Sequence, residues 1–449
     1  MFGSKAALEI LKKSSPNKRI YQKDLIVELS FSNKTIIKVL QKLVLAGVLE
    51  QGMERRKEKG KTVWTKWYTP TFQGKWITLL LQSPENLPKI EAKKIITELF
   101  MMYIENITTL CQHYNIESEI FESTINKAFI KIAEGSNPEA SAKSDVLVYG
   151  TSAIDTIIRV NTLPKIGETL YLSDVQMFSG GSASNVAVGV RRLGIPVSFS
   201  GKIGEDVKAL SLIEEFKKEG VDTSGIIIEP DKKTLTTLIT LNRSGEKRIY
   251  VLGGENVALS LSSPNEVNWK RITENKLIYI GEIFVELAEI IATYAKNHGK
   301  KVIYRPGLPI ITFNTKKVRN ALRNADIFIL NTQSWAVLKE AESSTPFDLL
   351  KMGPEIVILT KGLKGCETYT KNGVFMNSAY SVEAEDDTGA GDAFCAGLIC
   401  ALLDSKSLKQ CVQYALAASA ISILKKGART ALPTRSQVEE FMKYEKSKQ

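Results

Sequence analysis

The sequence predicts an α/β protein in which a small, basic, mainly helical domain and a helical connector precede a large α/β domain. The first observation is charge: the chain of 449 residues has a net charge of +11, and residues 1–84 hold 16 Lys and Arg against 6 Asp and Glu. The second is periodicity, because short apolar segments alternate with helical ones from Asp145 onward, as in a mainly parallel sheet covered on both faces. We therefore expect domains at 1–84 and 145–449, joined by a connector at 85–144.

Three helices open the basic domain. Apolar side chains define one face of the first two helices, at 6–11 and 25–29. Ser32 is expected to cap a third helix that runs over 33–46, and Gly47 is placed where a C-terminal glycine commonly ends a helix.

A β-hairpin is expected next, because two β-like segments at 48–51 and 63–68 flank a cationic tip at 54–61. This order of elements resembles the winged helix-turn-helix domain of archaeal and bacterial transcription regulators. The resemblance implies that polar positions of the third helix contact base edges and that wing cations contact phosphates. The side chains expected to contact DNA are Asn33, Lys34, Lys38, Gln41, Lys42, Arg55, Arg56 and Lys57.

Two alternatives stay open for this domain: a solvated charged surface, and a winged helix that docks a protein. The concentration of positive charge favours a polyanionic partner. Gly60-Lys61-Thr62 is similar to the end of a P-loop, but Arg55 stands where the first glycine of that motif is required, so we expect no P-loop here.

The connector shows apolar side chains every three to four residues after Pro88, which predicts a long amphipathic helix. A second helix is expected over 117–133, followed by a linker at 135–141. Packing against the large domain is one expectation for these helices. Formation of a homodimer is the other, because winged helices usually read two half-sites as dimers.

The large domain alternates predicted strands and helices. Buried strands are expected at 146–149, 197–200, 277–280, 301–304, 327–330 and 356–359, and helices at 184–193, 210–219, 285–297 and 316–323. A hairpin at 235–242 and 247–251, together with 169–178, is expected to form a small separate sheet.

Two glycine-rich segments of the large domain point to its chemistry: Gly180-Gly-Ser-Ala-Ser-Asn185 and Asp386-Asp-Thr-Gly-Ala-Gly-Asp392. Together they resemble the two signatures of the ribokinase-like (PfkB) family of sugar and nucleoside kinases, over about 145–433. The resemblance implies a three-layer α/β/α core with a small β lid, and ATP-dependent phosphorylation of a hydroxyl group with Mg²⁺ as cofactor.

The second segment suits phosphoryl transfer. The small residues Gly389, Ala390 and Gly391 allow backbone N–H groups to approach an anion at a helix N-terminus, which forms an anion hole. The resemblance assigns Asp392 as the catalytic base that accepts the proton of the attacking hydroxyl. The alternative is that this segment only caps a buried helix.

The resemblance also implies binding residues. Asp155, Gly180, Gly181 and Asn185 are expected to bind the acceptor. The alternative is that Gly180-Gly181 only forms a turn and that Asn185 only caps a helix. The residues expected to bind the nucleotide are Asn331, Thr360, Gly362 and Gly365. No metal ligands are assigned.

Two positions depart from the family pattern. Members usually carry an Asn-x-x-Glu motif, whereas this chain has Asn331 followed by Ser334, and Arg305 stands where an Asp is usual after a strand. A neutral hydroxyl cannot orient Mg²⁺ as a carboxylate does. The departures bear on catalytic rate, metal handling and substrate class, and they leave the base and the anion hole intact.

Composition excludes several classes. The apolar runs are too short to span a bilayer, the N-terminus lacks a signal-peptide core, and the five cysteines form no C-x-x-C pair. Two histidines exclude a histidine-rich metal site. We therefore expect a cytoplasmic protein with reduced thiols.

Three functions remain open at this stage. The first is a sugar, sugar acid or nucleoside kinase that is coupled to DNA binding. The second is a transcription regulator that uses a weakly active or inactive kinase fold to sense such an effector. The third is a kinase whose winged helix only mediates protein assembly.

Overall fold

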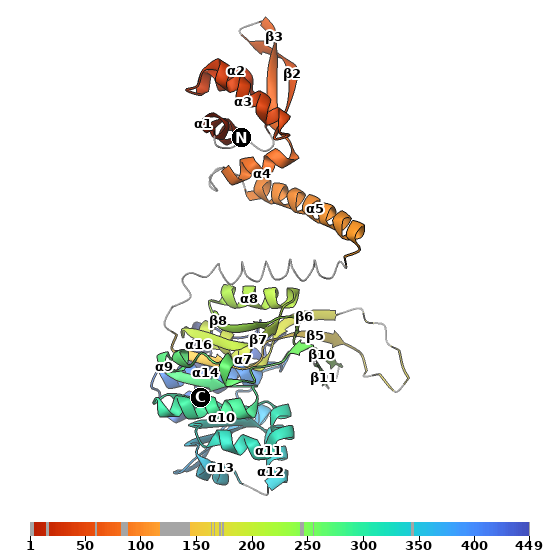
Figure 1. Cartoon of the computed structure of the whole chain (residues 1–449). Coiled ribbons are helices and arrows are strands. Elements are labelled where there is room, and N and C mark those ends of the chain that lie inside the picture. The colour runs from red at the N-terminus through yellow and green to blue at the C-terminus, as the bar shows by residue number, and fades with distance from the viewer. Residues whose placement is uncertain are drawn as a thin grey trace. The chain divides into compact units, whose positions relative to one another are not determined.

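The computed structural model describes residues 4–14, 18–58, 61–81, 89–116 and 144–448, the last range without 163, 166, 170, 171, 173, 174, 243–246, 255, 343 and 344. Its contacts divide the chain into two compact units, Met1–Phe121 and Glu122–Gln449 (Figure 1). The division falls inside the segment that the sequence predicts to be the connector. Each unit is described by itself.

The N-terminal unit consists of helices around a three-stranded antiparallel sheet with the strand order β1-β3-β2. Its elements are α1 (Lys5–Lys13), β1 (Ile20–Tyr21), α2 (Gln22–Glu28), α3 (Asn33–Leu45), β2 (Leu49–Glu58), β3 (Lys61–Pro70), α4 (Phe72–Leu81) and α5 (Lys89–Tyr114).

The third helix begins as the sequence predicts, because the Ser32 hydroxyl accepts a hydrogen bond from the Thr35 N–H at 3.2 Å. Its apolar face, with Ile36, Leu40 and Leu43, is fully buried in the core of this unit. The opposite face is therefore left for solvent or a partner.

The hairpin is longer than predicted, since β2 and β3 pair without a break from Leu49 opposite Pro70 to Glu58 opposite Lys61. Residues 54–58 are all charged, so this part of the strand lacks the alternation of apolar and polar residues by which a strand is recognised. The long helix after Pro88 is confirmed as α5. The second connector helix and the linker lie outside the described residues.

The large unit is built on a nine-stranded sheet with the order β18-β17-β16-β15-β14-β13-β4-β7-β8. Neighbours from β8 to β16 are parallel, and β17 and β18 add an antiparallel edge. The strands are β4 (Val146–Tyr149), β7 (Val197–Gly204), β8 (Asp222–Glu229), β13 (Leu277–Ile280), β14 (Lys301–Tyr304), β15 (Ile327–Asn331), β16 (Ile356–Thr360), β17 (Cys366–Thr370) and β18 (Gly373–Asn377).

Helices cover both faces of this sheet, which confirms the predicted α/β class (Figure 1). One hydrophobic core includes side chains of α7 (Ser182–Arg192), α14 (Ala390–Leu403), α15 (Leu408–Ser422) and α16 (Arg435–Ser447). The other includes side chains of α9 (Trp269–Glu274), α10 (Val285–Asn297), α11 (Leu308–Leu322), α12 (Thr332–Glu342) and α13 (Pro346–Met352). The continuous apolar strands fit a sheet that is buried on both sides.

A second, four-stranded sheet has the order β11-β10-β5-β6. It contains β5 (Ala153–Arg159), β6 (Val175–Gly180), β10 (Thr236–Leu241) and β11 (Lys247–Leu252). The predicted hairpin is confirmed, and the predicted 169–178 segment joins the same sheet from Val175 onward, as β6; residues 170, 171, 173 and 174 lie outside the described residues. The strand β5 was not predicted. A two-stranded ladder joins β9 (Lys233–Thr234) and β12 (Val257–Ala258), and α8 (Val207–Glu219) packs beside β5 and β7.

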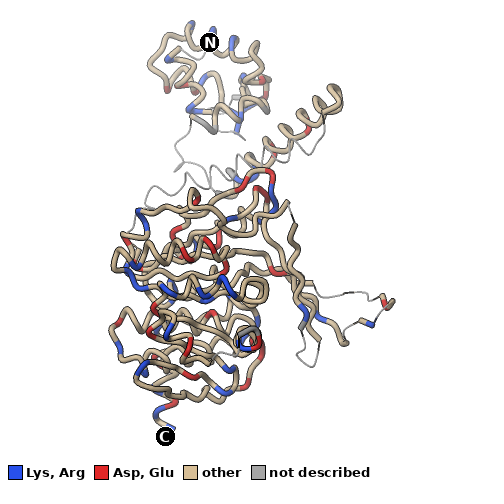
Figure 2. Tube along the Cα trace, turned by 60° about the horizontal axis from the view of Figure 1, so that its bottom comes forward, with Lys and Arg blue, Asp and Glu red and all other residues tan. Residues whose placement is uncertain are grey.

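Among the helices in the described ranges, none has the length and apolar character that crossing a membrane requires. Charge is unevenly distributed over the units: basic residues recur along the N-terminal unit, whereas both signs are mixed over the large one (Figure 2).

Candidate active site

The predicted kinase residues lie where the parallel strands of the large sheet end. β4, β13, β14, β15 and β16 point the same way, so the loops that follow them meet at one edge. Open α/β sheets bind ligands at the carboxyl ends of their strands. The site is therefore positioned by sheet topology.

Asp392 is the centre of this site. It lies in the first turn of α14 and is 6% exposed. Its Oδ1 accepts hydrogen bonds from the Ser182 hydroxyl at 2.8 Å and from Arg305 Nη1 at 2.9 Å, and its Oδ2 accepts one from Asn185 Nδ2 at 2.9 Å. Both oxygens of a buried carboxylate are thus held by donors, one of which carries a positive charge.

The predicted anion hole, Gly389 to Gly391, directly precedes Asp392 in the chain. Gly389 caps α14 with a φ of 85°, and a Cβ at this position would lie 2.8 Å from the Cα of Ala428. Only glycine adopts this conformation without strain in so little space. The turn brings the backbone of Ala390 and Gly391 to the N-terminus of a helix of 14 residues, where N–H groups favour an anion.

Asn185 belongs to α7, which starts after Gly181. The sequence assigns its amide to the hydroxyls of the acceptor, whereas in the structure Nδ2 bonds to Asp392 and Oδ1 accepts from Arg429 Nε at 3.4 Å. Gly181 has a φ of 91°, and a Cβ there would approach the Thr151 carbonyl oxygen to 2.6 Å. The tight turn therefore delivers both Ser182 and Asn185 to the base.

Asp155 lies on β5, and its Oδ1 accepts a hydrogen bond of 2.5 Å from the Thr237 hydroxyl on the neighbouring strand β10. Gly180 is required beside it, since a Cβ at Gly180 would lie 1.9 Å from Asp155 Oδ2. Burial raises the pKa of Asp155 above its ordinary value, and the negative charge of Asp392 adds to this shift. The structure thus brings the predicted acceptor residues close to the predicted base.

Two charged residues of the site were not predicted as binding residues. Glu282 follows β13, and its Oε2 accepts a hydrogen bond from the Ala183 N–H at 3.3 Å. Burial raises the pKa of Glu282. Arg305 follows β14. Both charged residues line a cavity of about 210 Å³, which is also lined by Ser182, Asn331, Ser334 and Asp392. Their place directly after neighbouring parallel strands is the sequence signal that could have found them.

Arg429 is a further buried charge that no sequence pattern indicates. Its Nη2 donates to the Ser184 hydroxyl at 2.8 Å and to the Gly180 carbonyl at 3.3 Å, and its Nη1 pairs with Glu215 at 3.0 Å. Burial lowers the pKa of its guanidinium. The loop after α15 is thereby tied to the turn that carries the acceptor residues.

The predicted nucleotide residues lie at the ends of β15 and β16. Asn331 pairs in register with Thr360, whose hydroxyl donates to the Leu330 carbonyl at 3.2 Å. The Oδ1 of Asn331 accepts the Ser334 N–H at 2.7 Å. Gly362 and Gly365 follow β16, with φ values of 57° and 84°. Of these predicted nucleotide residues, Asn331 lines the same cavity as Asp392.

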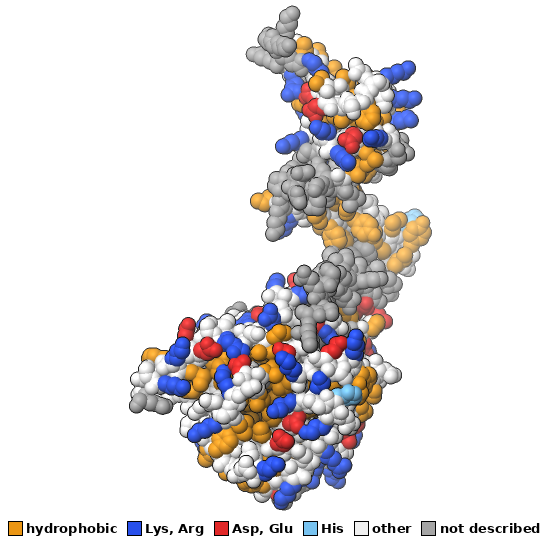
Figure 3. Space-filling model, turned by 90° about the vertical axis from the view of Figure 1, so that its left-hand side faces the viewer, with side chains coloured by type: hydrophobic (Ala, Val, Ile, Leu, Met, Phe, Trp, Pro, Cys, Tyr) orange, Lys and Arg blue, Asp and Glu red, His pale blue; other side chains and the backbone are white. Residues whose placement is uncertain are grey.

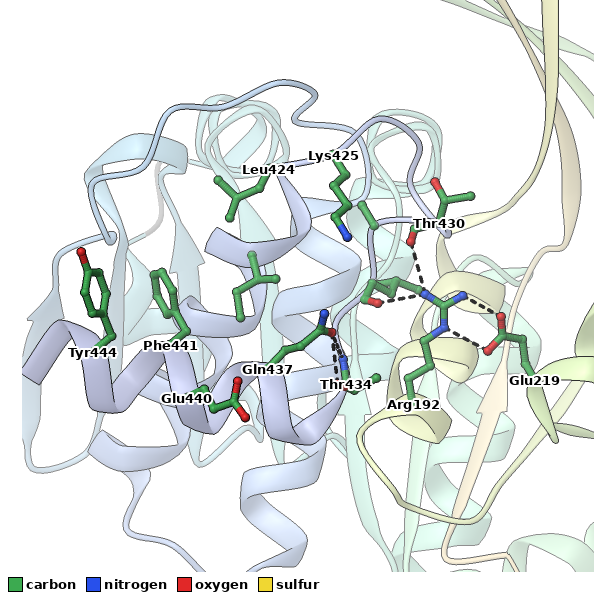
Figure 4. Close-up of a pocket in the computed structure, with 13 residues that line it drawn as sticks. Arg192, Glu219, Leu424, Lys425, Thr430, Thr434, Gln437, Glu440, Phe441 and Tyr444 are labelled. Carbon is green, nitrogen blue, oxygen red and sulfur yellow. Dashed lines mark hydrogen bonds and ion pairs between the residues drawn. The ribbon is translucent and has the colours of Figure 1, made fainter.

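A larger cavity of about 770 Å³ is lined by none of the predicted site residues. It lies beside α16, between the end of α15 and the 430–434 segment (Figure 4). At its rim the Arg192 guanidinium pairs with Glu219 and donates to the Leu432 carbonyl at 2.9 Å. These contacts hold the loop that carries Arg429.

Within the described ranges, no three His, Cys, Asp or Glu side chains are grouped so as to hold a metal ion. The cavity does offer two carboxylates, those of Glu282 and Asp392. Mg²⁺ commonly binds through one or two carboxylates together with substrate phosphates. The residues therefore fit a Mg²⁺ ion that enters with a nucleotide.

Residues 143–435 match the model of the pfkB family of carbohydrate kinases. Because this match spans more than half of the chain, the chain belongs to that family. The large unit is accordingly a phosphotransferase with an alcohol group as acceptor.

Several relatives have sugar kinase names. The chain is 30% identical over 309 residues to a ribokinase of Haemophilus influenzae, covering 67% of this chain and 99% of the relative. It is 29% identical to an ATP-dependent ribose-1-phosphate kinase of Halopiger xanaduensis, covering 66% and 97%. A solved ribokinase structure from Thermotoga maritima is 26% identical, with a TM-score of 0.59, over 67% of this chain and 99% of that one.

The raised pKa of Asp155 generates a prediction about stability. Because its pKa is higher in the folded than in the unfolded chain, the folded state binds the proton more tightly. Stability is therefore lost as pH rises through the interval from the ordinary carboxyl pKa to the raised one. Asp155→Asn keeps the shape and the Thr237 hydrogen bond, and we expect it to raise the Tm of the large unit at pH 7 by about 2–4 °C.

Calorimetry from pH 4 to pH 7 measures this effect. The gain should shrink as the pH falls toward the ordinary carboxyl pKa, because the unfolded chain then also binds the proton. A Tm at pH 7 below that of the unsubstituted protein would contradict the assignment of Asp155 as a destabilising buried charge.

Proposed function

We propose that the large unit transfers the γ-phosphoryl group of ATP to a hydroxyl group of a sugar, sugar acid or nucleoside. The observation that carries this proposal is the buried Asp392 carboxylate, which three donors hold at the N-terminus of α14. A hydroxyl that binds there lies within reach of both a base and the backbone N–H groups of an anion hole.

The acceptor is proposed to bind between Asp392 and the four-stranded sheet. Asp155 and Glu282 offer carboxylate oxygens to its hydroxyl groups, and Gly180 and Gly181 let it approach the backbone closely. Closure of the four-stranded sheet over the acceptor would exclude water before transfer. Orientation and water exclusion are the main contributions that this part of the chain makes.

ATP is proposed to bind along the ends of β15 and β16. The amide oxygen of Asn331 accepts the Ser334 N–H, so we propose that its Nδ2 donates to a phosphate. The name of the Halopiger xanaduensis relative includes ATP dependence, which supports ATP as donor. Mg²⁺, when bound, would neutralise charge on the nucleotide phosphates.

Membership of a kinase family and the complete setting of Asp392 favour catalysis over an inactive effector sensor. Ser334, which replaces the usual glutamate, lies in the same cavity as Asp392 and is 3% exposed. Its N–H donates a hydrogen bond of 2.7 Å to Oδ1 of Asn331. The substitution therefore changes the charge near the phosphates and leaves the base in place.

Asp392→Asn should lower kcat by roughly 10²–10⁴-fold, because the amide cannot accept the hydroxyl proton. ATP consumption across a panel of sugars, sugar acids and nucleosides measures this. Asp404→Asn, at the other end of the same helix and paired with Arg435, is the matched control and should retain turnover. Equal turnover in the Asp392 variant and the unsubstituted protein would refute the role of the base.

We further propose that residues 1–84 form a winged helix-turn-helix domain that binds DNA. The supporting observation is the outer face of α3, on which Asn33, Lys34, Lys38, Gln41 and Lys42 are all exposed. Basic side chains project from this unit in Figure 3. A helix with this surface suits the major groove, where polar side chains contact base edges.

The wing residues differ in their surroundings. Arg55 is exposed and lies over the ring of Trp64, 5.0 Å from its centroid. Arg56 lies over Tyr21 and 3.7 Å from the carboxylate of Asp24, so part of its charge is neutralised. The side chain of Lys57 lies outside the described residues. Arg55 is thus the better placed to contact a phosphate.

Duplex binding by the full chain should weaken with salt, and Arg55→Gln should reduce the slope of log K against log salt by about 0.9 for one lost phosphate contact. Arg56→Gln is the matched control and should change the slope less. Fluorescence anisotropy between 50 and 200 mM salt provides the measurement. Binding that is absent, or independent of salt, would contradict a DNA-binding role.

We also propose that α5 pairs two copies of the chain. Apolar residues recur along it at alternating intervals of four and three, the spacing of a coiled-coil seam: Ile96, Phe100, Tyr103, Ile107, Leu110 and Tyr114. Most of them are exposed in this chain, Tyr103 by 56% and Leu110 by 54%. Residues that flank the seam, such as Thr97, Ile104 and Asn106, are uncharged, so a symmetric pair meets no repulsion there.

Sedimentation at micromolar concentration should give the mass of a dimer, and Leu110→Lys should give the monomer, because a buried ammonium group opposes pairing. Thr108→Lys, on the outer face of the same helix, should remain dimeric. A monomeric mass for the unsubstituted chain would overturn the proposal.

A further inference from the structure

Arg305 is a charged residue that the acceptor and nucleotide sites do not account for. Its backbone is fixed at the sheet edge, because its N–H donates to the Ile280 carbonyl at 2.9 Å and Pro306 follows it. Its side chain is 20% exposed and lines the cavity of about 210 Å³. A guanidinium is thus held inside the site with little freedom to leave it.

The contacts of Nη1 orient this guanidinium. Nη1 donates to Asp392 Oδ1 at 2.9 Å and to the Ser182 hydroxyl at 2.8 Å, which occupies its two N–H groups. The planar group is therefore anchored on the base through one nitrogen. Because the guanidinium is planar, anchoring Nη1 also restricts the position of the second nitrogen, Nη2.

The second nitrogen, Nη2, lies at the anion hole. A Cβ on Gly391 would come within 2.6 Å of Nη2, so the missing side chain of Gly391 makes room for the guanidinium. The same glycine was assigned from sequence to the approach of a phosphate. Cation and anion hole therefore share one place, directly beside the base.

Acidic side chains surround this cation. Glu282, Asp392 and the nearby Asp155 are acidic, and a phosphoryl donor brings further negative charge. A phosphoryl group in transfer spreads its charge over three equatorial oxygens. A guanidinium next to these oxygens carries a positive charge and several N–H donors in one plane. It therefore stabilises the negative charge more strongly than neutral backbone N–H groups alone.

We propose that Arg305 is a catalytic residue that binds the phosphoryl group during its transfer, an inference that rests on the proposed kinase function. The oxygen of the acceptor hydroxyl forms a bond to the γ-phosphorus, and the bond between this phosphorus and the β–γ bridging oxygen breaks. The electron pair of the broken bond stays on ADP, and the hydroxyl proton passes to Asp392. Arg305 Nη2 donates to an equatorial oxygen throughout this step.

The experiment compares the affinities for ADP and for ADP with aluminium fluoride, a planar anionic mimic of the transferred group, by calorimetry with Mg²⁺ present. The unsubstituted protein should bind the fluoride complex at least about 10²-fold more tightly than ADP. In Arg305→Gln this ratio should fall to about threefold or less, with the affinity for ADP unchanged within twofold. Arg305→Lys, which keeps the charge and loses the fork, should give an intermediate ratio.

Turnover provides the second readout, and Arg305→Gln should lower kcat by about 10²–10³-fold, as loss of one oxyanion donor does. Arg271→Gln controls for the loss of a buried guanidinium, since Arg271 pairs with Asp222 away from the site; it should lower Tm and keep the affinity ratio. A ratio in Arg305→Gln equal to that of the unsubstituted protein overturns the role of Arg305. Absence of turnover in the unsubstituted protein with every acceptor instead overturns the proposed function, and the affinity ratio still decides the role of Arg305.

Discussion

The burial of one ionised carboxylate, Asp392, constrains the rest of the large unit. A buried charge is stable only when donors satisfy its oxygens, and here these donors come from α7 and from the residue after β14. The turn at Gly180-Gly181, the helix start at Gly389 and the parallel order of β13 and β14 are all needed to bring them together. The topology of the sheet therefore determines which side chains surround Asp392.

Charged residues farther out stabilise this arrangement. Arg429 connects the loop after α15 to Ser184 and Gly180, and Arg192 holds the same loop through Leu432 while it pairs with Glu219. The loop, the turn at Gly180-Gly181 and α8 are thus linked by two guanidinium groups.

Local sequence patterns predicted much of this molecule: six of the nine strands of the large sheet, the hairpin of the small sheet, the long helix after Pro88 and the two glycine-rich turns. They did not predict β8, β17 or β18 of that sheet, nor β5, where polar residues interrupt the apolar pattern. They also missed the full length of the β2–β3 hairpin, where charged residues replace that pattern. Local sequence patterns could not predict the hydrogen-bond partners of Asp392 for another reason. Arg305 and Asn185 lie 87 and 207 residues away from it in the chain, and only the folded sheet brings them within hydrogen-bond distance.

The central claim is that an acceptor hydroxyl meets the phosphoryl donor at Asp392. The most direct test is a crystal structure with an acceptor identified by turnover, Mg²⁺, ADP and aluminium fluoride. The account predicts an acceptor oxygen about 2.6–3.2 Å from an Asp392 carboxylate oxygen. It also predicts the planar fluoride between that acceptor oxygen and ADP. An acceptor whose hydroxyl groups all lie away from Asp392 would contradict it.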